Sequence, residues 1–148
     1  MGDRDSTPNP VAIHQVHPTC SLEEETVRAA IERTVEGEGV TIRELNVVLT
    51  DHTTVHDLNR EWLGHNYETD VVSFVLDEAA PAQRLVDGEV YVDLDTAAER
   101  AEEFGATFEQ EVLRYVIHGL LHLMGYDDAT DTERARMRAL EDRYLGDA

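Results

Sequence analysis

Residues 107–128, TFEQEVLRYVIHGLLHLMGYDD, contain the longest apolar-periodic segment of this 148-residue chain. Thr107 and Gln110 have the spacing of a capping box, which predicts a helix start. The apolar side chains then recur at helical spacing over a wide stripe: Val112, Leu113, Val116, Ile117, Leu120, Leu121 and Leu123. A stripe of this width is typical of a helix buried on most sides. The sequence therefore predicts a buried helix from residue 107 to about residue 123.

Two histidines, His118 and His122, interrupt this apolar helix four residues apart. At this spacing both imidazoles lie on one side of the helix and can reach one ion. Gly125 is the residue type that most readily ends a helix in the left-handed conformation, so the chain can bring Asp127 or Asp128 back toward the histidines. Two histidines and one carboxylate, with a coordination position left over, form the ligand set of a catalytic zinc site. The alternative is two packed histidines, each of which needs a polar partner when buried.

Other catalytic motifs are missing from the sequence. The H-E-x-x-H signature of zinc peptidases requires glutamate at the position that Gly119 occupies, so this chain lacks the general base of that class. There is no G-x-S-x-G elbow, no phosphate-binding G-x-x-x-x-G-K-[ST] loop and no G-x-G-x-x-G turn. The motif therefore favours a metal-dependent hydrolase that is not a peptidase of the H-E-x-x-H type.

The rest of the chain alternates strand and helix patterns. The strands are expected at residues 11–16, 44–50, 69–76 and 88–94, and the further helices at 21–37, 51–63, 95–104 and 130–144. The run 69–76, TDVVSFVL, has the strongest pattern of a buried strand. Ser21 with Glu24, and Thr130 with Glu133, are spaced as capping boxes, and Trp62 shares an apolar helix face with Val55. This order predicts an α+β fold with one mixed sheet of three to four strands, helices packed on it, and the metal site on a C-terminal helix-turn.

The length predicts a single domain spanning residues 1–148, with a flexible polar segment at 1–10. No apolar run approaches the roughly 20 residues that span a bilayer, and the polar N-terminus does not resemble a signal peptide. Cys20 is the single cysteine and cannot form an internal disulfide, which is typical of a reducing compartment. We therefore expect a cytoplasmic protein without membrane association.

The net charge of −20 comes from 32 acidic residues against 12 basic ones, and every basic residue is an arginine. Such a balance usually argues against nucleic-acid partners, because phosphate contacts need cationic side chains. The acidic residues are spread over nearly every segment, which indicates a general surface adaptation rather than a binding tail. A high-salt cytoplasm, where screening removes most of the self-repulsion, would explain this composition.

The segment from His118 to Asp127, HGLLHLMGYD, closely resembles the H-G-x-L-H-L-x-G-Y-D-H signature of the YbeY family. The resemblance extends to Leu58-Asn59, to TDVVSF at residues 69–74, and to GEVYV at residues 88–92, and it covers roughly residues 45 to 145. It implies an α+β metal-dependent endoribonuclease with one zinc ion per chain held by three side chains. The implied substrate is single-stranded RNA, in 16S rRNA 3′-end processing and ribosome quality control. The implied partners are rRNA, the small ribosomal subunit and its assembly factors.

The chain departs from the signature at Asp128, where the family has its third histidine. A carboxylate binds zinc at nearly the same distance as an imidazole, so the expected ligands are His118, His122 and Asp128. The anionic ligand would lower the positive charge of the site and make a bound water less acidic. The alternative is that Asp128 caps the last helix. Asp127 matches the family's own aspartate and is expected to orient a ligand.

A second departure is Leu63, which stands where the family often carries an arginine. Arg60, one helical turn earlier, is the candidate to hold a phosphate and joins His118 and His122 in the expected catalytic set; a solvated Arg60 is the alternative. His65 is a further candidate for substrate binding.

Two residues of the expected strand 69–76, Asp70 and Ser73, are candidates for RNA contact. Asp70 could instead form a cap or turn, and Ser73 could be a buried hydroxyl bonded to backbone. Two other functions fit the same motif: a ribosome assembly factor with a structural zinc and little nuclease activity, which would bind a ribosomal protein or a partner GTPase, and a zinc hydrolase acting on a small molecule.

The charge of the chain leads to a prediction about salt. We expect the midpoint of thermal unfolding to rise between dilute buffer and about 1 M NaCl, where the Debye length falls to about 3 Å and like charges no longer repel over the surface. Circular dichroism at increasing NaCl measures the midpoint, and an uncharged osmolyte serves as control. Equal stability in dilute buffer and in molar salt would contradict the adaptation.

Overall fold

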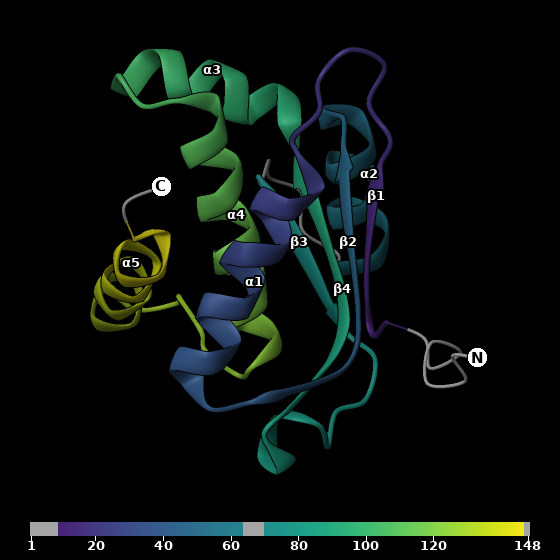
Figure 1. Ribbon diagram of the computed structural model, residues 1–148, viewed down its shortest axis with the longest axis vertical. Helices are drawn as coiled ribbons and strands as arrows, with labels where there is room; N and C mark the ends of the chain where they lie inside the picture. The colour runs from purple at the N-terminus through teal and green to yellow at the C-terminus, as the bar shows by residue number, and fades with distance from the viewer. Residues whose placement is uncertain (1–8, 64–69, 147–148) are drawn as a thin grey trace, which may run out of the picture.

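The structure, a computed structural model, describes residues 9–63 and 70–146 and contains a four-stranded sheet (Figure 1). The strand order is β1-β2-β4-β3. Strands β1 (Val11–Gln15), β2 (Thr41–Thr50) and β4 (Leu85–Asp93) are parallel, and β3 (Val71–Val75) pairs antiparallel with β4. This arrangement is a mixed sheet, and it confirms the predicted α+β class.

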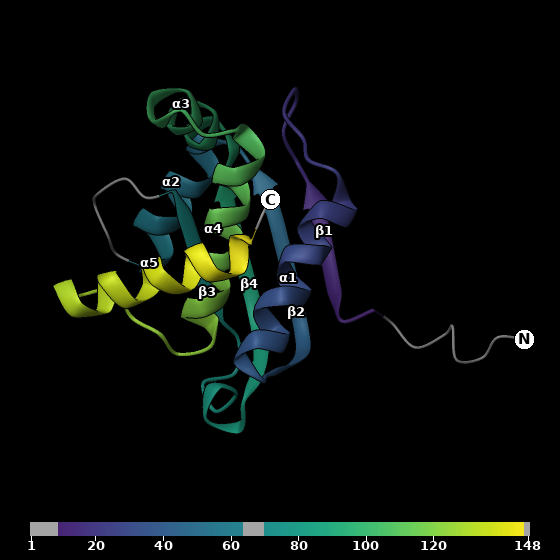
Figure 2. The ribbon, with the colours of Figure 1, turned by 60° about the vertical axis from the view of Figure 1, so that its left-hand side comes forward.

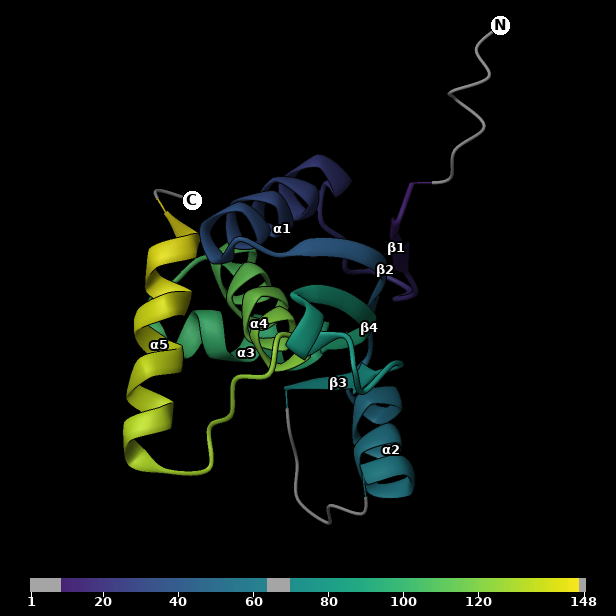
Figure 3. The ribbon, with the colours of Figure 1, turned by 90° about the horizontal axis from the view of Figure 1, so that it is seen from below.

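The described residues form five α-helices. They are α1 (Glu24–Glu38), α2 (His52–Leu63), α3 (Leu94–Phe104), α4 (Phe108–Leu123) and α5 (Asp131–Leu145), with a short 3₁₀ helix, η2 (Pro81–Gln83), before β4. Helices α1, α4 and α5 lie on one side of the sheet and α2 on the other (Figure 3). Helix α5 packs against α4 and α1 rather than on the sheet itself, and it crosses the outer side of α4 (Figure 2). None of the described helices is long and apolar enough to cross a membrane.

Helix α4 is the centre of the packing, as its wide apolar stripe predicts. It contacts β3 and β4 as well as α1, α3 and α5. Thr107 and Gln110 form the expected capping box, in which each side chain bonds the other's backbone N–H. Its apolar side chains meet the inward-facing residues of the parallel strands, which are fully buried: Leu45, Val47, Leu49, Val86, Val90 and Val92.

Several sequence expectations need correction. Strand β3 was expected to be deeply buried, but it is an edge strand with only Val72 buried, because it pairs with β4 alone. Trp62 was expected to share the apolar face of α2 with Val55, but its side chain is 71% exposed. The buried face of α2 contains Val55 and Asn59. The Ser21–Glu24 capping box is absent, because α1 begins at Glu24 after an N-cap at Glu23 that makes no side-chain bond.

The turn between α4 and α5, where the metal site is expected, begins and ends as the sequence predicts. Thr130 and Glu133 form the predicted capping box of α5, and Gly125 has a positive φ of 105° after the end of α4. Of the N-terminal segment 1–10 that was expected to be flexible, residues 1–8 lie outside the described residues. The carbonyl of Pro10 accepts a hydrogen bond of 2.8 Å from the Leu45 N–H.

Gly119 allows α4 to approach the sheet closely. A Cβ atom at this position would lie 2.5 Å from Val90 Cγ1, 3.1 Å from Ser73 Oγ and 3.2 Å from Val71 Cγ2. The first contact is too short for two carbon atoms and the other two are tight, so a side chain here would push the helix or the strands apart. The glycine that removes the peptidase glutamate is therefore a packing requirement of this fold.

We expect Gly119→Ala to destabilise the protein by about 1–2 kcal/mol, because overpacking outweighs the better helix propensity of alanine. Urea denaturation measures the change in the free energy of unfolding. In a Val90→Ala background, which creates room for the new methyl group, the same substitution should cost less. An equal cost in both backgrounds would contradict the close-approach argument.

Candidate metal centre

The side chains of His118 and His122 converge on one point beside α4. Their Nε2 atoms lie 3.1 Å apart. Asp128 Oδ2 lies 3.4 Å from His118 Nε2 and 3.5 Å from His122 Nε2. These three residues form the only group of potential metal ligands found within the described part of the chain. The structure thus brings together the three residues that the sequence suggested as ligands.

Hydrogen bonds fix which nitrogen of each imidazole faces this point. His122 Nδ1 lies 3.0 Å from the carbonyl oxygen of Tyr126, and a carbonyl only accepts, so Nδ1 carries the proton. His118 Nδ1 lies 2.6 Å from Glu141 Oε2, and a carboxylate likewise selects the Nδ1–H form. In this Nδ1–H form, both imidazoles direct Nε2 at the carboxylate of Asp128. Three lone-pair donors at this spacing repel one another unless a proton or a metal cation lies between them.

The spacing fits a zinc ion. Bonds of about 2.0–2.2 Å to nitrogen and oxygen place tetrahedral ligand atoms roughly 3.3–3.6 Å apart, and the observed separations are 3.1, 3.4 and 3.5 Å. The three side chains are 23%, 28% and 39% exposed for His118, His122 and Asp128. A partly exposed set of three ligands leaves room for a further ligand, as in catalytic sites, whereas structural zinc sites are closed by four protein ligands.

Asp128 is held in place by the turn between α4 and α5. Its N–H donates to Asp127 Oδ1 at 2.8 Å, and its carbonyl accepts from Arg134 Nη1 at 3.2 Å. The N-cap of α5 is Thr130, so the alternative role of Asp128 as the helix cap does not hold. Asp127 is exposed and its Oδ1 accepts the Asp128 N–H, and its expected role in orienting a ligand stays a prediction.

Two carboxylates, buried Glu141 and half-buried Glu38, fix the two imidazoles. Glu141 on α5 is 6% exposed and binds both His118 and, at 3.0 Å, Arg114 Nη1. Glu38 on α1 accepts hydrogen bonds from the hydroxyls of Tyr126, at 2.6 Å, and Tyr144. Because the Tyr126 carbonyl binds His122, Glu38 fixes the second imidazole indirectly. The hydrogen bond to Glu38 also raises the pKa of Tyr126.

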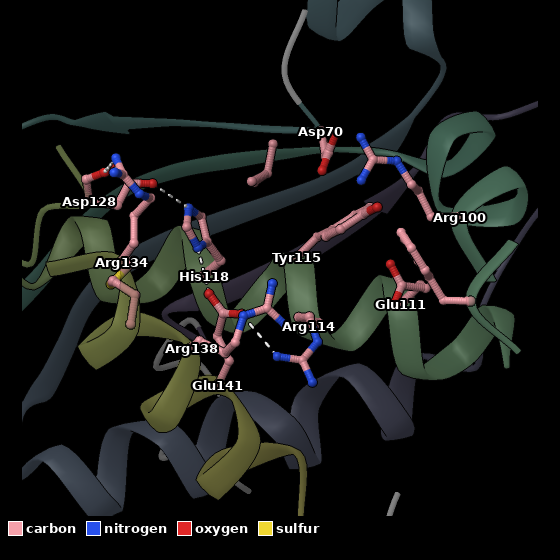
Figure 4. A pocket seen from close by; sticks show the side chains of 13 residues that line it. Asp70, Arg100, Glu111, Arg114, Tyr115, His118, Asp128, Arg134, Arg138 and Glu141 are labelled. Carbon is pink, nitrogen blue, oxygen red and sulfur yellow. Dashed lines mark hydrogen bonds and ion pairs between the residues drawn. The ribbon is translucent and has the colours of Figure 1, made fainter. Parts of the chain in front are cut away.

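The candidate metal centre opens into a cleft of about 680 Å³ between α3, α4, α5 and the start of β3 (Figure 4). Four arginines and four carboxylates line it: Arg100, Arg114, Arg134 and Arg138, and Asp70, Glu111, Asp128 and Glu141. Tyr115, Val71, Phe104 and Met137 complete the walls together with His118. A third of the chain's arginines therefore gather at this cleft, although the chain as a whole is strongly acidic.

Asp70 and Tyr115 also line the cleft. Burial raises the pKa of Asp70, and the charge of Arg100 opposes this shift. Burial and the Asp70 charge raise the pKa of Tyr115 well above its usual value. The Tyr115 hydroxyl has no hydrogen-bond partner within the described part of the chain, and Figure 4 shows it pointing toward Asp70 and Arg100.

The other expected site residues lie apart from the metal centre or outside the description. Ser73 donates to the carbonyl of Gly119 at 3.0 Å, which is the backbone bond considered as its alternative role. Arg60 is exposed, pairs with Asp57 at 3.0 Å and does not line the cleft. His65 lies outside the described residues. Contacts of Ser73, Arg60 and His65 with RNA stay predictions.

The sequence analysis did not identify Glu141 or the cleft arginines. Arg134, Met137, Arg138 and Glu141 follow an i, i+3, i+4, i+7 pattern, so they share one face of α5. That pattern was readable as a helix face, but nothing in a single sequence showed that this face meets His118.

Most of this chain matches a known protein family. A family model described as Endoribonuclease YbeY matches residues 13–148. The chain belongs to the YbeY family. This confirms the resemblance drawn from the histidine motif and its upstream segments.

Individual YbeY relatives match over most of their length. Endoribonuclease YbeY of Salinibacter ruber is 50% identical over 143 residues, which are 93% of this chain and 91% of that protein. Endoribonuclease YbeY of Chlorobaculum tepidum is 42% identical over 123 residues, 82% of this chain and 87% of that protein. The solution structure of TM1509 from Thermotoga maritima is similar, with a TM-score of 0.59 and 32% identity over 90% of this chain and 86% of that one.

We expect zinc to bind with one ion per chain and to be lost in His118→Ala and Asp128→Ala. Glu141→Gln should weaken zinc binding by about 10–100-fold, because partners of ligating histidines typically contribute this much. Isothermal titration calorimetry with a competing chelator measures the affinity. Asp142→Asn is the matched control, since Asp142 is the next residue on α5 and pairs with the same Arg114. Zinc affinity that is unchanged in Asp128→Ala would rule out Asp128 as the third ligand.

Proposed function

We propose that this YbeY-family chain is a zinc-dependent endoribonuclease that hydrolyses single-stranded RNA. Its proposed role is 16S rRNA 3′-end processing and ribosome quality control in the cytoplasm, with the small ribosomal subunit and its assembly factors as partners. We further propose that residues 1–148 act as one hydrolase domain. The observation that carries the proposal is the convergence of His118, His122 and Asp128 in an open cleft.

The proposed ligands hold the ion through atoms whose orientation the fold determines. Glu141 and the Tyr126 carbonyl keep the protons of His118 and His122 on Nδ1, so that both Nε2 atoms remain available. A bound zinc ion supplies Lewis-acid activation of water and of a phosphoryl oxygen. Asp128 reduces the net charge of this site relative to a three-histidine set, so a bound water would be less acidic and we expect the rise of activity with pH to shift toward higher pH.

The cleft walls provide the contacts for the substrate in this proposal. Asp70 lines the cleft at the start of β3 and is available to the ribose or base of a bound nucleotide. Single-stranded RNA fits such a site because its bases and sugar edges are accessible for hydrogen bonding, whereas a duplex hides them. Arg60 and His65 remain candidates for binding more distant phosphates. The Ser73 hydroxyl donates to the Gly119 carbonyl, so its main proposed role is to position α4.

The main alternative is a ribosome assembly factor with a structural zinc and little nuclease activity. The net charge of −20 and the pairing of Arg60 with Asp57 favour it. The partial exposure of all three proposed ligands favours the enzyme instead, because an open coordination position has a use only in catalysis.

A cleavage assay separates the two functions. We expect zinc-loaded protein to cleave a labelled single-stranded RNA oligonucleotide, to leave the corresponding duplex intact, and to lose activity after treatment with a chelator. His118→Ala and Asp128→Ala should lose at least about 100-fold in rate, which is the scale of removing a metal-based electrophile. His14→Ala is the matched control, because His14 is exposed and bonds Asn46 on β2, away from the cleft. Zinc-loaded protein that leaves the RNA uncut would favour the assembly factor.

A further inference from the structure

Two arginines of the cleft, Arg100 and Arg138, form no ion pair with a carboxylate among the described residues. Both are exposed, and neither makes a hydrogen bond, ion pair or ring contact with any residue in the ranges 9–63 and 70–146. Arg100 acts only through its charge, on Asp70 and Tyr115. An acidic chain offers many carboxylates, so unpaired guanidinium groups are unexpected here.

Every other arginine that the structure describes is engaged. Ion pairs with carboxylates hold five of them: Arg28, Arg43, Arg60, Arg114 and Arg134. Backbone carbonyls bind two more, Arg33 and Arg84. Tyrosine rings lie against the last two, Arg136 and Arg143. The two exceptions both line the same cleft, the one that contains the candidate metal centre.

The two side chains enter the cleft from different helices. Arg138 lies on α5, one turn before Glu141, which binds His118. Arg100 lies on α3 near Asp70, as Figure 4 shows. The unpartnered Tyr115 hydroxyl, on a side chain only 6% exposed, points toward the same part of the cleft. Two guanidinium groups without an ion pair, beside a buried hydroxyl, indicate a polar, anionic ligand.

We propose that Arg100 and Arg138 each bind a backbone phosphate of the RNA that occupies the cleft, with one phosphate near α3 and another near the metal centre. The planar guanidinium group matches the geometry of phosphate oxygens and forms paired, charge-assisted hydrogen bonds with them. This inference rests on the proposed function. It also specifies how an acidic protein holds a polyanion: the two arginines without an ion pair both line the cleft that the RNA would occupy.

The neighbouring Arg134 does not share this role. Its guanidinium binds the carbonyls of Asp128 and Ala129 and pairs with Asp131. These contacts hold the turn that carries the third proposed ligand. Substitution of Arg134 would therefore disturb the metal centre, whereas Arg100 and Arg138 can be changed without breaking a contact within the described part of the protein.

The test measures binding separately from cleavage. Zinc-loaded protein is titrated into a fluorescent single-stranded RNA with phosphorothioate linkages, which resist hydrolysis, and anisotropy gives Kd at several salt concentrations. We expect Arg100→Gln and Arg138→Gln each to raise Kd by roughly tenfold, the effect of losing a charge-assisted hydrogen bond. Each should also reduce the slope of log Kd against log salt by about 0.7, the value for one phosphate contact on a single strand.

Two controls separate phosphate binding from charge and folding. Arg143→Gln removes the same charge from α5 outside the cleft and should leave Kd unchanged. Arg138→Lys should keep the salt slope, because the charge remains, while it weakens binding through loss of the paired hydrogen bonds. Zinc content and circular dichroism show that each variant retains the metal centre and the fold.

The outcomes separate this inference from the proposed function. If wild-type protein binds and cleaves RNA while Arg100→Gln and Arg138→Gln keep its Kd and salt slope, the phosphate contacts are overturned and the nuclease stands. If wild-type protein neither binds nor cleaves single-stranded RNA, both proposals are overturned. If Arg143→Gln weakens binding as much as the cleft variants, net charge explains the effect and the inference is overturned.

Discussion

The fold must hold three lone-pair donors, His118, His122 and Asp128, close together although they repel one another. Both imidazoles commit Nδ1–H to a fixed acceptor, Glu141 for His118 and a carbonyl for His122. Their Nε2 atoms must then face each other at 3.1 Å with the Asp128 carboxylate close by. Without the two acceptors, either ring could flip or change tautomer and relieve the repulsion. The fold thus holds the donors together before any ion binds, which lowers the cost of ordering the site.

Each element of the fold contributes to that constraint through a specific contact. Gly119 lets α4 approach the sheet, and Ser73 on β3 donates to the Gly119 carbonyl. These two contacts fix the distance of α4 from the sheet and its rotation about its own axis. Helix α5 supplies Glu141 to the first histidine. Helix α1 supplies Glu38, whose bonds to Tyr126 and Tyr144 tie the turn and α5 together. A displacement of any of these elements would reach the candidate metal centre through one or two hydrogen bonds.

The sequence predicted the α+β class, α4 and the three proposed ligands, because those depend on periodicity and on spacing within about ten residues. It misjudged β3, since a run of apolar residues does not reveal whether a strand has one neighbour or two. It could not identify Glu141, which lies 23 residues from His118, because a tertiary hydrogen bond leaves no local pattern. It also gave weight to Arg60, since a single sequence does not show that Asp57 pairs with it.

The difference between overall composition and individual contacts also explains how an acidic chain is compatible with a polyanionic substrate. Net charge acts over a Debye length and is screened by salt, whereas a guanidinium in contact with a phosphate is not. We therefore expect the charge of −20 to act on the stability of this protein and on its long-range attraction or repulsion of partners. Recognition depends instead on which arginines remain unpaired and where they lie. Composition alone argued against RNA, and it is the pairing of individual arginines, visible only in three dimensions, that removes this objection.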